Sequence, residues 1–152
     1  MSEYSQHVNI SYPASWPIIP DAHCTVMYLG QIDELNYTAD DVVDAIRGYS
    51  SGILLHAKIR GLEMFGPDND IPVFRLDEPT LEPRMRAIQA ALHARDIRST
   101  SEYYQEGVEY KPHVTWPGLD IKETIQIPKY VLLTEPELWW GDERHDLGGK
   151  PY

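Results

Sequence analysis

The sequence is short of cysteine and of long apolar runs, and each shortage excludes a class of protein. The 152 residues contain one cysteine, Cys24, so no disulfide can form within the chain and stability has to come from packing. No uncharged apolar run approaches the roughly 18 residues that a membrane-spanning helix needs. Residues 1–7 are polar and acidic, unlike a secretory signal. We therefore expect a cytoplasmic protein with no membrane partner.

Basic residues are also scarce. Thirteen lysines and arginines stand against 24 aspartates and glutamates, which gives a formal net charge of −11. A charge of this sign opposes the approach of a long polyanion such as duplex DNA or structured RNA. Any nucleic-acid-like substrate should therefore be small, and most of the acidic residues are expected only to keep the protein soluble.

The composition, with 42% hydrophobic and 24% charged residues, predicts one globular domain over residues 1–152, and we expect a monomer. The strands expected from alternating patterns cover residues 7–12, 23–29, 53–66, 72–76, 110–116, 127–134 and 138–140. Helical spacing predicts helices over residues 38–49 and 80–96, the second with Leu81, Met85, Ile88 and Leu92 on one face. The polar, turn-rich segment from Gly141 onward is expected to be loosely held.

Two of the six histidines are followed two positions later by a threonine. They are His23 with Thr25 and His113 with Thr115, and each pair lies in an expected strand. Because side chains alternate along a strand, each histidine should share a face with its threonine. With seven threonines in the chain, two such pairs arise by chance only about 3% of the time. The repetition indicates a function, although a lone strand histidine is more often structural.

Two histidines and two hydroxyl groups are the parts that phosphodiester cleavage needs. The reaction requires a base for the attacking oxygen, an acid for the leaving oxygen, and hydrogen-bond donors for the non-bridging oxygens. With an unperturbed pKa of about 6.5, one imidazole can be neutral while the other is protonated. Such a site would need neither a metal ion nor a cofactor.

Two other chemistries are weaker interpretations. A zinc site is disfavoured by the single cysteine, by the lack of a closely spaced histidine pair, and by the lack of a helix-borne histidine–glutamate motif. Cys24 is a poor candidate nucleophile because alternation points it away from His23, so we interpret it as a core residue.

The sequence resembles the two-histidine (2H) phosphoesterases, which include bacterial 2'-5' RNA ligase-like proteins and 2',3'-cyclic nucleotide phosphodiesterases. The matching stretches are His23-Cys-Thr-Val-Met-Tyr-Leu-Gly30, Gly61-Leu-Glu-Met-Phe-Gly66 and Pro112-His-Val-Thr-Trp116. Their order, with the long helix between the second and the third, is similar to the family layout across nearly the whole chain.

The resemblance implies a bilobal α+β fold in which two antiparallel sheets form a central cleft and the helices pack outside. It also implies that one of His23 and His113 is the general base and the other the general acid, with Thr25 and Thr115 holding the phosphate. Which histidine has which role depends on the orientation of the substrate. The implied substrate is a small nucleotide or short oligonucleotide with a 2',3'-cyclic phosphate or a 2'-5' linkage.

One departure from the family pattern concerns substrate binding. Many relatives carry a basic residue shortly after the second motif, where this chain has Trp116-Pro117-Gly118. Lys111 could supply a compensating charge, and Trp116 or Tyr28 a stacking surface. These three are therefore candidate substrate-binding residues, each with a structural role as the alternative.

Two alternative functions stay open. Phage-encoded relatives degrade cyclic nucleotide signals that bacteria use in antiviral defence, and this chain could belong with them. It could also bind a nucleotide or an RNA end without turning it over, although both motifs are intact.

Overall fold

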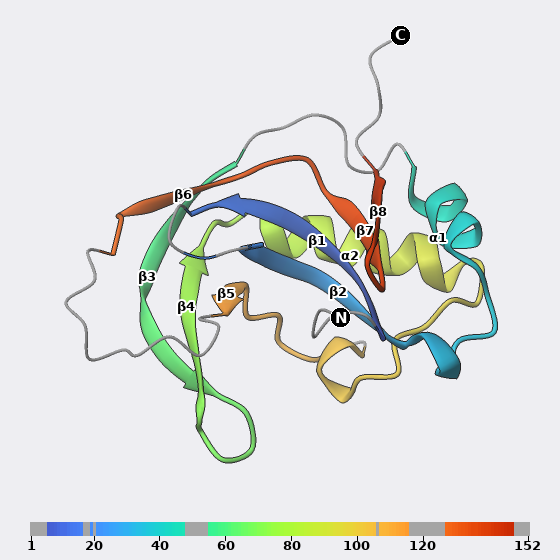
Figure 1. Ribbon diagram of the computed structural model, residues 1–152, viewed down its shortest axis with the longest axis horizontal. Helices are drawn as coiled ribbons and strands as arrows, with labels where there is room; N and C mark the ends of the chain where they lie inside the picture. The colour runs from blue at the N-terminus through green and yellow to red at the C-terminus, as the bar shows by residue number, and fades with distance from the viewer. Residues whose placement is uncertain are drawn as a thin grey trace, which may run out of the picture.

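The computed structural model describes residues 6–16, 19, 21–47, 55–105, 107–115 and 127–147. Within these ranges the chain forms eight β-strands and two α-helices (Figure 1). The strands are β1 (His7–Ser15), β2 (His23–Gln31), β3 (Leu55–Phe65), β4 (Ile71–Asp77), β5 (His113–Thr115), β6 (Tyr130–Leu133), β7 (Glu137–Trp140) and β8 (Glu143–Asp146). The helices are α1 (Ala39–Ile46) and α2 (Leu81–His93), with two short 3-10 helices, η1 (Ile32–Glu34) and η2 (Glu102–Tyr104).

The described strands pair into one antiparallel sheet with the order β2-β5-β4-β3-β6-β1-β7-β8, and β2 also pairs with β1. The sheet consists of two halves. One half contains β2, β1, β7 and β8, and the other contains β5, β4, β3 and β6. The expected two sheets are therefore hydrogen-bonded to each other, through a short β2–β5 contact and a short β1–β6 contact. The predicted α+β class is confirmed.

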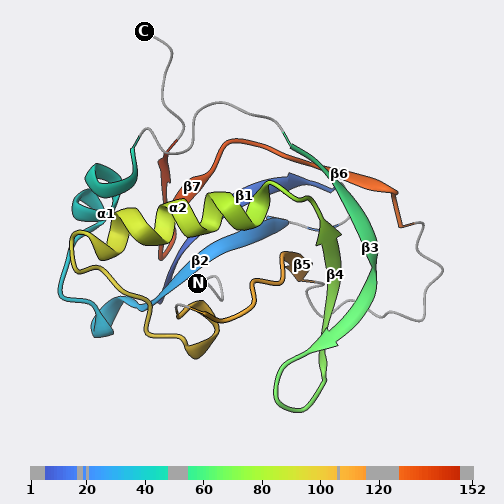
Figure 2. The same ribbon diagram turned by 180° about the vertical axis from the view of Figure 1, so that it is seen from behind.

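Helix α2 covers one face of this sheet. In Figure 2 it lies across the front of β1 and β2, and α1 lies beside its far end. The four apolar residues expected on one face of α2 are all at most 2% exposed. They pack into one core cluster with strand residues such as Cys24, Val26 and Val114. The sheet face that carries Cys24 is therefore the core face.

Local sequence explains where α1 begins. Thr38 is the N-cap, and its hydroxyl accepts a hydrogen bond from the Asp41 backbone N–H at 3.2 Å. The Asp41 carboxylate accepts in return from the Thr38 N–H at 2.8 Å, which completes a capping box. The expected helix start at Thr38 is thus confirmed, and the last part of the expected range, residues 48–49, lies outside the described residues.

The prediction of a loosely held segment from Gly141 onward is wrong for residues 141–147. These residues form a turn and strand β8, which pairs with β7 in the register Trp139↔Arg144. Gly141 has a φ of +60°, which glycine adopts without strain, and so it permits the tight turn. The Arg144 guanidinium then lies 4.0 Å from the centre of the Trp139 ring, a cation–π contact that holds the two strands together. Residues 148–152 lie outside the described part.

No helix in the described part of the chain is long and apolar enough to cross a membrane.

Candidate active site

The two histidine–threonine pairs meet where β2 and β5 are hydrogen-bonded. Cys24 of β2 lies opposite Val114 of β5 in an antiparallel register, and both side chains are fully buried in the core. Because side chains alternate, the residues that flank Cys24 and Val114 project from the other face of the sheet. The structure therefore places His23, Thr25, His113 and Thr115 together on one surface.

The register also fixes how these four residues are arranged. Antiparallel pairing at Cys24 and Val114 places His23 opposite Thr115 and His113 opposite Thr25. The two histidines therefore occupy one diagonal and the two threonines the other. Diagonal neighbours on an antiparallel pair lie about 7–8 Å apart. A phosphate group between the two imidazole rings would have a hydroxyl on each remaining side.

The two imidazole rings are held in the same way. His23 Nδ1 is 2.9 Å from the Asp21 carbonyl oxygen, and His113 Nδ1 is 2.7 Å from the Lys111 carbonyl oxygen. A carbonyl oxygen only accepts hydrogen bonds, so in both rings Nδ1 carries the proton and donates it. Nε2 is then the basic nitrogen of each neutral ring. Each histidine can therefore exchange a proton through Nε2 without losing the bond that orients it.

His23 lies against an aromatic ring that is itself covered by an arginine. The His23 and Trp139 ring centres are 4.2 Å apart, and the Arg144 guanidinium is the group over Trp139. Burial lowers the pKa of His23, and the positive charges of His113 and Arg144 lower it further. The hydrogen bond to the Asp21 carbonyl and the Asp21 carboxylate act in the opposite direction. The neutral form of His23 is favoured on balance.

The surroundings of His113, in the other half of the sheet, resemble those of His23. Its ring is 4.8 Å from the Phe65 ring, and the Arg75 guanidinium is 5.8 Å from the centre of Phe65. Arg75 on β4 also lies directly opposite His113 in the β4–β5 register. Burial lowers the pKa of His113, the bond to the Lys111 carbonyl raises it, and the Arg75 charge lowers it.

The two arginines are held by different groups. Arg75 forms an ion pair with Glu63, with 2.9 Å between Nη1 and Oε2, and its side chain is only 11% exposed. Arg144 donates to the backbone carbonyl oxygens of Gly141 and Glu143, at 2.9 and 3.2 Å. A positive charge is thus held beside each of the two histidines.

Tyr110 connects the strands that carry the two motifs. Its hydroxyl donates to the Thr25 carbonyl oxygen at 2.8 Å and lies 3.7 Å from Cys24 Sγ. Tyr110 is 8% exposed, and burial raises its pKa well above 10, so the hydroxyl stays protonated as a donor. Burial also raises the pKa of the Cys24 thiol to about 11. Cys24 is thus a core residue, as the sequence predicted, and at neutral pH it is not a thiolate.

Replacing Tyr110 by phenylalanine tests this connection. We expect the free energy of unfolding to fall by about 1 kcal/mol, because one buried hydrogen bond is lost and the Thr25 carbonyl loses its partner. Urea unfolding of the variant and of the wild type measures the effect. Unchanged stability would show that the bond does not hold the Tyr110 segment to β2.

A cavity of about 750 Å³ opens beside His113 and Thr115. Lys111, one of the three residues predicted to bind substrate, lines this cavity with an exposed side chain. Tyr28 is placed elsewhere, because its hydroxyl is 2.7 Å from His7 Nδ1 and it lies five positions along β2 from His23. Trp116 lies outside the described residues. The structure thus places Lys111 at the site and Tyr28 toward the other end of its strand.

Sequence reasoning missed four residues that surround the histidines, namely Phe65, Arg75, Trp139 and Arg144. Phe65 belongs to the stretch Gly61-Leu-Glu-Met-Phe-Gly66 that carries the family resemblance, but that motif does not predict its contact with His113. Trp139 is one of two adjacent tryptophans in β7, and because side chains alternate along a strand only one of them can face the histidines. Nothing in the local sequence distinguishes Arg75 or Arg144 from an ordinary strand arginine, because their approach to the histidines depends on how β4 pairs with β5 and β7 with β1.

The usual protein ligands of metal ions are histidine, cysteine, aspartate and glutamate side chains. Within the described part of the chain, no group of three or more of these side chains is placed to hold a metal ion.

Two solved structures share this fold. Escherichia coli LigT complexed with 3'-AMP is 16% identical, with 88% of this chain and 86% of that chain covered and a TM-score of 0.52. A second crystal structure, of a phosphoesterase, is 15% identical over the same shares of the two chains, with a TM-score of 0.51. No protein-family model and no curated protein matches the chain. The fold implied by the resemblance is confirmed, since it is the fold of a LigT protein and of a phosphoesterase.

Proposed function

We propose that this chain is a phosphodiesterase that hydrolyses a small nucleotide or a short oligonucleotide, at a 2',3'-cyclic phosphate or a 2'-5' linkage. The observation that carries the proposal is the antiparallel register at Cys24 and Val114, which places two imidazoles and two hydroxyls around one point. The shared fold with LigT and with a phosphoesterase supports it. The proposal is also supported by the two Nδ1 hydrogen bonds, because each histidine is oriented by the backbone carbonyl oxygen of the residue two positions before it.

In the proposed reaction, one histidine accepts a proton and the other donates one. Nε2 of the neutral histidine takes a proton from water while the water oxygen forms a bond to phosphorus. The phosphorus–oxygen bond to the leaving group breaks, and the protonated histidine gives its proton to that leaving oxygen. The two histidines end with exchanged protonation states, and proton exchange with solvent restores them. The chemistry requires no metal ion in this scheme.

Thr25 and Thr115 are the proposed donors to the non-bridging phosphate oxygens. They occupy the second diagonal of the site, so their hydroxyl groups flank the same point as the two imidazoles. Hydroxyl donors aimed at oxygen atoms that gain negative charge in the transition state stabilise that state more than the ground state. Arg144 and Arg75 add a positive field at the two ends of the site.

A small substrate fits the charge of the protein. The net charge of −11 opposes binding of a long polyanion, while a mononucleotide carries only one or two charges. The LigT structure with the same fold holds 3'-AMP, which is a ligand of this size.

A substrate panel tests the proposal. The purified protein is incubated in EDTA with 2',3'-cyclic mononucleotides, 2'-5' dinucleotides and cyclic oligonucleotides, and the products are separated by chromatography. Turnover of the first two classes supports the proposal. Turnover of cyclic oligonucleotides alone would instead favour degradation of a signalling nucleotide. Binding without turnover of any member would favour a nucleotide-binding protein.

The pH dependence follows from the environments of the two histidines. Burial lowers both pKa values from the ordinary 6.5, and Arg144 beside His23 and Arg75 beside His113 lower them further, against the opposing effects of Asp21 on His23 and of the Lys111 carbonyl on His113. Activity needs one protonated ring, and this proton is lost as the pH rises through the upper apparent pKa of the pair. We therefore expect a bell-shaped profile of kcat/KM with its maximum below pH 6.5. A rate that rises steadily from pH 5 to pH 9 would contradict acid–base catalysis by this pair.

A further inference from the structure

The cavity beside His113 is larger than a phosphate group requires. Its volume of about 750 Å³ lies in the range of sites that hold whole small molecules. His113 and Thr115 form one part of its lining. The remainder comes from the end of the β3–β4 hairpin, at residues 64–73, and from the segment 103–111. The cavity is therefore continuous with the catalytic residues and extends away from them on one side.

Exposed apolar side chains gather in this cavity. Met64, Ile71 and Tyr103 line it, and their exposed fractions are 42%, 43% and 60%. They are three of the six large hydrophobic residues that are exposed in the described part of the chain. A cluster of exposed apolar side chains in a concavity is typical of a binding site, whereas single exposed residues are ordinary.

The cavity has almost no net charge. Apart from His113, the titratable side chains of Glu109 and Lys111 are the only acidic or basic ones in its described lining, and they offset each other. A second phosphate group would find no excess positive charge here. Asn69, at the tip of the hairpin, contributes an amide that can both donate and accept a hydrogen bond. The lining thus suits a neutral, flat, mostly apolar group with polar edges.

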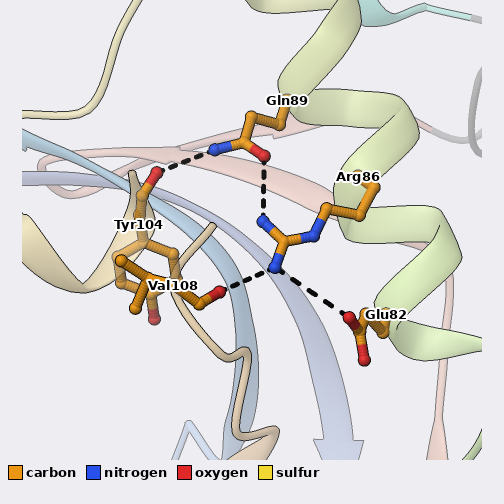
Figure 3. A network of polar contacts seen from close by, with 5 residues as sticks. All are labelled: Glu82, Arg86, Gln89, Tyr104 and Val108. Atoms are coloured by element: carbon orange, nitrogen blue, oxygen red, sulfur yellow. Dashed lines mark hydrogen bonds and ion pairs between the residues drawn. The ribbon is translucent and has the colours of Figure 1, made fainter. Parts of the chain in front are cut away.

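One wall of the cavity is fastened to α2. Gln89 donates from Nε2 to the Tyr104 carbonyl oxygen at 2.9 Å, and Arg86 donates to the Val108 carbonyl oxygen at 2.6 Å (Figure 3). Arg86 also donates to Gln89 Oε1 at 3.2 Å. These bonds fix the backbone at Tyr104 and at Val108, both of which line the cavity. This part of the wall is therefore positioned before a ligand arrives, which reduces the entropy lost on binding.

We propose that this cavity is a nucleobase subsite, in which the base of the substrate stacks on Tyr103 between the hairpin and the 103–111 segment. The proposal rests on the proposed function, since it names the group that enters beside His113. It assigns base binding to Tyr103, which lines the cavity beside His113, whereas Tyr28 is not part of the described lining. Stacking on an exposed aromatic ring tolerates any of the four bases, so the subsite distinguishes nucleotides from base-free phosphodiesters.

The test compares two exposed tyrosines and two substrates. Tyr103→Ala is matched by Tyr130→Ala on β6, where the side chain is 56% exposed and outside the cavity. The substrates are adenosine 2',3'-cyclic phosphate and the corresponding methyl riboside 2',3'-cyclic phosphate, which lacks the base. We expect Tyr103→Ala to raise KM for the adenosine substrate about 5- to 150-fold and to leave the base-free substrate unchanged. Tyr130→Ala should change neither KM.

A second variant tests the wall rather than the stacking ring. Arg86→Met removes the bonds to Val108 and to Gln89 without replacing a residue of the cavity lining, and Arg95→Met, at an exposed position just after α2, is its control. We expect Arg86→Met to raise KM for the adenosine substrate several-fold with little change in kcat. A fall in kcat for the base-free substrate as well would show damage to the whole fold rather than to this subsite.

Failure of this inference can be told apart from failure of the proposed function. Equal KM values for both substrates in wild type and Tyr103→Ala would overturn the nucleobase subsite while turnover persisted. If no substrate is turned over, binding of adenosine 2',3'-cyclic phosphate is measured by calorimetry. Binding that Tyr103→Ala weakens and Tyr130→Ala does not would support the subsite and overturn the enzyme. Binding that neither variant changes would overturn the subsite.

Discussion

Replacing either His23 or His113 by glutamine is expected to lower kcat/KM by about 10²- to 10⁴-fold, the usual contribution of a general acid or base. Glutamine keeps a side chain of similar length that can donate to the Asp21 or Lys111 carbonyl oxygen, but it cannot take up a proton at Nε2. The free energy of unfolding should change little by comparison. Initial rates over a range of substrate concentrations, with urea unfolding in parallel, measure both quantities.

A histidine outside the site provides the control. His56 on β3 is exposed, and His56→Gln should retain wild-type kcat/KM. The double variant His23→Gln/His113→Gln should be about as inactive as the worse single variant, because the acid and the base act as a unit. If either single variant kept more than a tenth of the wild-type rate, that histidine would not be a proton-transfer group.

Thr25→Val and Thr115→Val are expected to have the next largest effects. Valine has nearly the same shape as threonine but no hydroxyl, so each variant removes one proposed hydrogen bond to a charged phosphate oxygen. Such a bond contributes about 1.5–3 kcal/mol, which corresponds to a loss of about 10- to 150-fold in kcat/KM. Because the charge on these oxygens grows in the transition state, most of the loss should appear in kcat.

Thr38→Val is the matched control for the threonines. Thr38 is the exposed N-cap of α1, and its hydroxyl accepts a hydrogen bond from the Asp41 backbone N–H at 3.2 Å, so it serves the helix and neither motif. The control variant should therefore slow the reaction little, while any loss of stability provides the reference for Thr25→Val and Thr115→Val. Wild-type rates in both site variants would remove these two residues from phosphate binding.

The sequence predicts the elements of the fold better than their connections. Alternation and helical spacing identified the regions of seven strands and both helices, because burial of one face imposes these periods locally. The same alternation predicted that each histidine shares a face with its threonine. The pairing of β2 with β5 could not be read from either motif, since it joins Cys24 and Val114, which are ninety positions apart in the sequence.

Strand β8 shows why a local pattern can mislead. Its residues, Glu143–Asp146, are polar and alternate only weakly, so they resemble a loop. They form a strand because Gly141 allows the turn and because Trp139 offers a ring to Arg144. The contact between Trp139 and Arg144 is local, but their approach to His23 depends on the pairing of β7 with β1 and of β1 with β2, which the local sequence does not show. Lys111, by contrast, was predicted to supply charge and does line the cavity.

The β2–β5 contact has one further consequence, which concerns the residue types at its centre. Cys24 and Val114 fill the space between the sheet and α2 directly behind the two motifs, and both are fully buried. A bulkier side chain at either position has no room in the core, so the strands would have to tilt apart. The volumes of Cys24 and Val114 therefore set the separation of the two imidazole rings, although both side chains lie on the opposite face of the sheet from the substrate.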